Sequence, residues 1–257
     1  MGIDLQMLTA PLMAGVLPFF RILALLQFAP VIDNRAFSRR IKVATALAIT
    51  LIITPMLPAL PVLTELLSLR TILLIGEQLL WGFLFGMALQ LVFVTLQTAG
   101  HILSMNMGLG MAMMNDPING SSTTVIAQII YVFCALLFFI MDGHLLLITI
   151  LFKGFSYWPI GEALNQPTLM LVAQGLGWIM SAATLIALPT TFVMLIVQGG
   201  FGLLNRISPT LNLFSLGFPI SMLFGLLCIS MLFTSIPDHY LNLTNEILAR
   251  LDAVRVH

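Results

Sequence analysis

Hydrophobic residues occur in long blocks along this chain, and short polar segments separate the blocks. Six apolar regions can be marked, at about 10–32, 41–63, 71–99, 125–151, 169–201 and 210–236. Apolar blocks of this length are typical of helices that cross or border a membrane. On hydropathy alone, the pattern predicts an all-α integral membrane or membrane-associated protein with six spans.

Prolines interrupt several of these predicted spans. In the second region, Pro55, Pro58 and Pro61 leave about 12 residues, or roughly 18 Å of helix, which is shorter than a hydrocarbon core of about 30 Å. The fifth region is too long for a straight span and contains Pro189, which predicts a kinked helix or a pair of helices. Backbone groups freed by such breaks cannot face lipid, so we expect broken helices and helical hairpins buried against protein or water.

Polar residues inside the apolar regions are candidate functional positions. We expect Arg21 to pair with a carboxylate or to extend to an interface, and Glu77 to lie in the first turns of its helix. The segment "MDGH" predicts a break between two apolar halves, with the Asp142 side chain capping the second half. Arg206, in "NRISP", predicts a turn between two helices.

Small residues indicate close helix packing. Gly82 and Gly86, in "GFLFG", lie one turn apart on one helix face, and Gly217 with Gly225 and the segment "QGGFG" add further candidates. Such contacts could hold a bundle that packs on itself or one that packs on partner subunits. The number of proline breaks favours partner subunits.

Composition supports the membrane assignment and limits the function. The 257 residues are 60% hydrophobic and 8% charged, with a mean hydropathy of +1.08 and a formal net charge of zero. Soluble domains carry about a quarter charged residues. Without a basic patch, nucleic acid is not expected as a partner.

The sequence contains no catalytic, metal-binding or cofactor-binding motif that we recognise, so no enzyme activity and no cofactor are predicted. A small-solute channel or transporter remains an alternative, although no internal repeat supports it. The first polar segment concentrates positive charge, which places it in the cytoplasm by the positive-inside rule. The basic residues there are Arg35, Arg39, Arg40 and Lys42.

The stretch "MNMGLGMAMMNDPINGSS", residues 105–122, is too apolar for an ordinary exposed loop and too rich in glycine and polar groups to span a bilayer. Unbranched methionines can fill an irregular gap and re-pack, while glycine and the Asp-Pro and Asn-Gly pairs favour turns. The residues alone leave open what covers this stretch, and a buried crossover of the core is one interpretation. The residues that we single out are Met105, Met107, Gly108, Gly110, Met111, Met113, Met114, Asp116 and Pro117.

Five segments in order resemble the FliR/SctT family of type III export-gate proteins. They are "PFFRILALLQFAPVID" with "RRIKVATALAIT", "IGEQLLWGFLFGMALQ", "MGLGMAMMNDPINGSS", "DGHLLLI" and "NRISPTLNLFSLGFPI". The resemblance covers about 18–233, and Asp142 and Thr210 depart from the family pattern. The last residues, from about 239 onward, match nothing that we recognise.

The resemblance implies one export-gate domain over 1–257, with a FliP-like part at about 1–170, a FliQ-like helical hairpin at about 171–240 and a polar tail at 241–257. It implies one copy of the chain in a bacterial inner-membrane complex of the flagellar basal body, with FliP-like, FliQ-like and FlhB-like partners. The complex would pass unfolded protein substrates, and residues 105–122 would plug its passage. Gly82, Gly86, Arg206 and Gly217 would serve packing and assembly. The injectisome counterpart is the nearest alternative.

Overall fold

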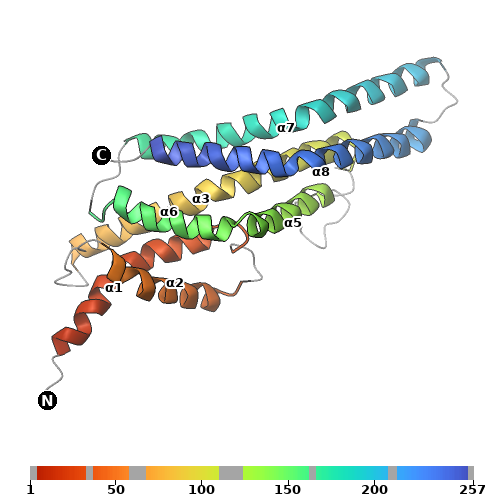
Figure 1. Ribbon diagram of the computed structural model, residues 1–257. Helices are drawn as coiled ribbons and strands as arrows, with labels where there is room; N and C mark the ends of the chain where they lie inside the picture. The colour runs from red at the N-terminus through yellow and green to blue at the C-terminus, as the bar shows by residue number, and fades with distance from the viewer. Residues whose placement is uncertain are drawn as a thin grey trace. The chain divides into compact units, whose positions relative to one another are not determined.

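The computed structural model describes residues 5–32, 37–57, 68–109, 124–161, 166–207 and 213–253, and these residues form helices and short turns without a strand (Figure 1). The all-α prediction is therefore confirmed. The elements are α1 (Leu5–Phe28), α2 (Arg39–Ile53), the 3-10 turn η1 (Thr54–Met56), α3 (Leu69–Asn106), α5 (Val125–Ile140), α6 (Gly143–Tyr157), α7 (Gln166–Ile207) and α8 (Leu213–Ala253).

Two compact units share these helices. The first is made of Met1–Gln90, Phe138–Ala173 and Ile247–His257, and the second of Leu91–Leu137 and Gln174–Glu246. In the first unit, α1 packs against both α2 and the first part of α3. In the second unit, the last part of α3 packs against α5, α7 and α8. The helices α3, α5, α7 and α8 therefore each have residues in both units.

The count of six spans from hydropathy is wrong for the described residues. By length and composition, α3, α7 and α8 are each able to cross a membrane, and the bent pair α5 and α6 provides a fourth span if it is taken as one. The described apolar part of α1, Met13–Phe28, is shorter. With 15 residues, α2 is about 22 Å long, too short for a core of about 30 Å.

Proline has different effects in different helices. As predicted, α2 stops before Pro55, which lies in η1, whereas Pro58 and Pro61 lie outside the described residues. By contrast, α7 is one helix that continues through Pro189, so of the two predicted forms, a kinked helix or a pair of helices, the pair is not formed. A proline removes one backbone donor, and packing of a long apolar helix against its neighbours can compensate for that loss.

The long helices α7 and α8 form an antiparallel hairpin, and they lie side by side in Figure 1. Trp178 near the start of α7 donates a hydrogen bond of 2.6 Å from Nε1 to Oε1 of Glu246 near the end of α8. The described part of the expected polar tail, residues 241–253, is helical and forms the end of α8, which continues past Pro237. The tail side chains Leu243, Ile247 and Leu251 are buried at helical spacing, which explains why the tail is helical and amphipathic.

The break predicted at "MDGH" is confirmed, but the Asp142 side chain does not cap α6. Asp142 has φ 55, in the left-handed region, and its side chain accepts no cap hydrogen bond. Instead, its backbone carbonyl accepts from the amides of Leu145 (2.9 Å) and Leu146 (3.0 Å). A side chain on Gly143 would overlap the Phe138 ring and lie 2.8 Å from the Phe138 carbonyl oxygen, so the turn requires glycine there.

Candidate functional site at the end of α3

The last turn of α3 ends in a Schellman motif centred on Gly108. Gly108 has φ +78, a backbone conformation that glycine adopts without steric cost. Its amide donates to the Met105 carbonyl and the Leu109 amide donates to the Ser104 carbonyl, both at 3.0 Å. These are the two hydrogen bonds that define the motif and satisfy carbonyls that the helix leaves free. The chain therefore leaves α3 in a fixed direction as it enters residues 110–123.

Polar side chains tie this end of α3 to α7. Nδ2 of Asn106 donates to Oγ1 of Thr191 at 2.9 Å. Nε2 of Gln198 donates to the backbone carbonyl of Asn106 at 2.7 Å, so another free carbonyl of the helix end is satisfied. Thr191 and Gln198 are seven residues apart, or two turns of α7, and both address the same residue of α3.

On α8, Gly225 and the ring of Phe218 pack against the same end of α3. The side chain of Met107 occupies the space that a Cβ at Gly225 would need, with the Met107 Cε and Sδ atoms 2.6 Å from that position. A Cβ at Gly108 would lie 3.2 Å from the Phe218 ring. Because these contacts come from both helices of the hairpin, the base of the predicted gate segment is held within the second unit. We call these residues the α3 anchor: Asn106, Met107, Gly108, Thr191, Gln198, Phe218 and Gly225.

The structure separates the first two methionines of the predicted gate segment. Met105 is still helical and 60% exposed, whereas Met107 is 1% exposed and fills the gap at Gly225. Met107 therefore packs inside the second unit, and only Met105 of the pair is exposed. The other predicted residues, Gly110, Met111, Met113, Met114, Asp116 and Pro117, lie outside the described residues.

The structure places Gly82 and Gly86 of α3 against α1. A Cβ at Gly82 would overlap the carbonyl oxygen of Arg21 and lie 2.7 Å from Cβ of Ala24. A Cβ at Gly86 would lie 2.8 Å from the carbonyl oxygen of Leu25 and 2.9 Å from Cβ of Phe28. The two glycines thus bring the backbones of α1 and α3 together inside this chain.

Other predicted packing positions behave differently. Gly217 is buried in α8, whereas Arg206 is exposed in the last turn of α7, next to the undescribed residues 208–212. A Cβ at Gly199, Gly200 or Gly202 of "QGGFG" would meet nothing within 4 Å. The expected small-residue contacts of that segment are therefore not made within the described part of the chain.

A buried arginine is the strongest polar feature of the first unit, and sequence reasoning missed its role. Arg21 is 0% exposed, and its Nε donates to Oε1 of Gln78 at 2.7 Å. Its two NH groups donate to the carbonyls of Gly154 (3.0 Å) and Trp158 (3.1 Å). The guanidinium carbon also lies 4.4 Å from the centre of the Phe155 ring. Arg21 therefore joins α1, α3 and the carboxyl end of α6, where a cation is favoured.

Glu77 supports the same region but does not lie at a helix start. It is in the third turn of α3, and its Oε1 accepts from the backbone amide of Gly161 at 3.2 Å. The same atom accepts from Nε2 of Gln78, also at 3.2 Å. Arg21 does not extend to an interface, whereas the Glu77 carboxylate acts on it electrostatically, in line with the expected pairing with a carboxylate. The expected position of Glu77 in the first turns of its helix is corrected. The only sequence signal was an arginine and a glutamine within apolar helices.

The sequence profile of "Bacterial export proteins, family 1" matches residues 12–247. The chain belongs to this family of bacterial export proteins. The match extends beyond the segment of resemblance and includes the first part of the predicted tail. It confirms the family resemblance, and with it the assignment to a membrane-associated secretion component.

Curated relatives agree with the family match. The chain is 34% identical over 231 residues to "Flagellar biosynthetic protein FliR" of Escherichia coli (strain K12), covering 90% of this chain and 88% of that protein. It is 33% identical over the same length to the protein of that name from Pectobacterium carotovorum subsp. carotovorum, with the same coverage. "Yop proteins translocation protein T" of Yersinia pestis is 27% identical over 168 residues, covering 62% of this chain and 64% of that protein. These similarities support a flagellar type III export-gate subunit, as expected from the sequence.

Proposed function

We propose that this family member is a non-enzymatic subunit of the flagellar export gate in the bacterial inner membrane. It works with FliP-like, FliQ-like and FlhB-like partners to form the passage for unfolded protein substrates. Family membership, combined with a large uncovered apolar surface, supports this proposal most strongly. Within the described ranges, no group of three or more His, Cys, Asp or Glu side chains could hold a metal ion.

The uncovered surface lies on the α7–α8 hairpin. We compared how much of the most apolar 18-residue stretch of each helix is buried inside the chain. The buried share is 33% for α7 and 28% for α8, but 67% for α3. Side chains such as Leu185, Phe192 and Leu223 are more than 60% exposed. An apolar surface of this extent needs lipid or other subunits to cover it. The open glycines of "QGGFG" favour subunits, because small residues allow close helix approach.

Residues 105–122 seal the passage in this proposal. The α3 anchor fixes the start of the segment through hydrogen bonds to α7 and packing on α8. Beyond the anchor, Met111, Met113 and Met114 supply flexible apolar side chains that can close around a gap and re-pack when a substrate passes. A fixed base with an adaptable end suits an element that must open without dissociating.

Deleting about 110–120 should leave assembly intact, because the α3 anchor lies outside the deletion. We expect the deleted complex to conduct ions when reconstituted in a planar bilayer, while the wild-type complex stays closed. Replacing Met111, Met113 and Met114 with alanine should give a smaller leak, since the segment remains but fills less space. As a control, Met56→Ala, which truncates an exposed methionine of η1 outside this segment, should conduct no more than the wild type.

Two outcomes would contradict the sealing function. A deleted complex that assembles and remains closed would show that another element makes the seal. A deletion that prevents assembly would show that the segment belongs to the packed core.

The injectisome alternative rests on the match to the Yop translocation protein, which covers 62% of this chain against 90% for the flagellar relatives. The greater coverage and identity favour the flagellar system. Restoration of motility in a strain that lacks its FliR protein is the expected result for a flagellar subunit. Restoration of virulence-type secretion without motility would favour the injectisome.

A further inference from the structure

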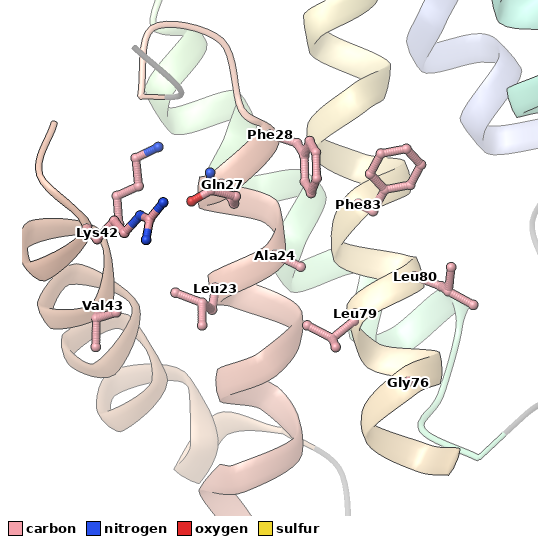
Figure 2. A pocket seen from close by; sticks show the side chains of 11 residues that line it. Leu23, Ala24, Gln27, Phe28, Lys42, Val43, Gly76, Leu79, Leu80 and Phe83 are labelled. Atoms are coloured by element: carbon pink, nitrogen blue, oxygen red, sulfur yellow. The ribbon is translucent and has the colours of Figure 1, made fainter. Parts of the chain in front are cut away.

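A groove in the first unit runs between α1, α2 and the first part of α3, with a volume of about 570 Å³ (Figure 2). This volume lies within the range of about 300–1,000 Å³ that is usual for small-molecule sites. All the residues that line it belong to the first unit. The groove is separate from the α3 anchor, and the proposed export function does not use it.

The charge of the groove is concentrated at one end. Arg39 and Lys42 reach it from the first turn of α2, and Gln27 joins them from α1. Lys42 is only 5% exposed, and Figure 2 shows Lys42 and Gln27 at the same end of the groove. Among the described residues that line the groove, none is acidic. The charged side chains that line this end are therefore both cationic.

The rest of the groove is apolar. Leu23 of α1 and Leu79 of α3 both line it, and Figure 2 shows the Leu79 side chain directed toward α1. The rings of Phe28 and Phe83 meet edge to face with centroids 4.7 Å apart, and they add an aromatic wall. Gly76 lines the same wall, and a Cβ there would meet nothing within 4 Å. The groove thus has a cationic end and an apolar part, which match the two ends of an anionic amphiphile.

We propose that this groove binds one anionic phospholipid. Its phosphate lies at Arg39, Lys42 and Gln27, and an acyl chain lies along the apolar part of the groove, against Leu23 and Leu79. The amino end of α2 adds its helix dipole to the two cations, so a phosphate is favoured over a neutral head group. The positive-inside expectation for this segment places it toward the leaflet surface that carries anionic lipids.

Native mass spectrometry of the co-expressed export-gate complex, titrated with dioleoylphosphatidylglycerol or dioleoylphosphatidylcholine, tests the proposal. We expect the wild type to retain one more phosphatidylglycerol than Arg39→Gln/Lys42→Gln, which should bind that lipid about thirtyfold more weakly at this site. Gly76→Leu should also lose that lipid, because Gly76 lines the groove and has room for a Cβ, so the rest of the new side chain would take space from the lipid. Both variants should assemble, since neither change removes a residue of the α1–α3 contact.

Matched controls are available in the chain. Arg40→Gln removes a neighbouring exposed charge that does not line the groove, and Gly177→Leu adds the same side chain at another open glycine. Both controls should keep the wild-type lipid count. Equal binding of the two lipids, or unchanged binding in the groove variants, would overturn the proposal. The proposal would also be overturned if the wild-type complex carried no lipid and the groove variants lost partner subunits, because protein would then cover the groove.

Discussion

Alanine at both Gly82 and Gly86 is expected to prevent the chain from accumulating in the membrane and from entering a complex. Each new Cβ would meet backbone atoms of α1, namely the carbonyl oxygens of Arg21 and Leu25, which cannot move without shifting the helix. Overpacking costs about 1–3 kcal/mol per site, and backbone contacts belong at the upper end of that range. The amount of chain recovered with co-expressed partners after affinity purification measures the effect.

The pair Gly76→Ala and Gly177→Ala is the matched control, because a Cβ at either position meets nothing within 4 Å. Alanine favours helix more than glycine does, so this control should accumulate at least as well as the wild type. Normal recovery of the Gly82/Gly86 variant would show that α1 and α3 do not require this close approach.

Replacing Arg21 with methionine is expected to be about as damaging. Methionine fills much of the space but leaves buried acceptors on Gln78 and Trp158 without the hydrogen bonds that they now accept. Hydrogen bonds to a charged group contribute about 1.5–3 kcal/mol each, and an unsatisfied buried acceptor adds a further cost. We expect complex yield and thermal stability in detergent to fall severely, with Arg21→Lys intermediate because lysine lacks the planar fork.

Two comparisons make the Arg21 prediction specific. Arg70→Met removes an exposed arginine from the first turn of α3 and should change little. Adding Gln78→Leu to Arg21→Met should restore part of the yield, because one unpaired acceptor is then removed. Full yield from Arg21→Met alone would argue against a structural function for the buried guanidinium.

The sequence could predict which residues are unusual more readily than what they contact. The spacing of Gly82 and Gly86 indicated a close helix contact, but no local pattern shows that the facing backbone belongs to Arg21–Phe28 of the same chain. Likewise, Met107 and Gly225 are distant in sequence, so their packing contact depends on the tertiary fold. Family resemblance supplied the function where local patterns could not.

The ends of helices could also be predicted only in part from local sequence patterns. Pro55 correctly predicted the end of α2, because the helix ends at Ile53 and Pro55 lies in the following turn η1. Pro189 did not end α7, since the hairpin packing of a long helix outweighs one lost hydrogen bond. Asp142 predicted a side-chain cap, yet its left-handed backbone presents the carbonyl instead.

The assembly is tested most directly by the native mass spectrum of the complex obtained when this chain is co-expressed with FliP-like and FliQ-like subunits. Our account predicts a single main species that contains one copy of this chain together with several copies of both partners. The exposed apolar hairpin of α7 and α8 would be covered in that species. A stable, monodisperse chain without partners, recovered from the same extract, would contradict the account.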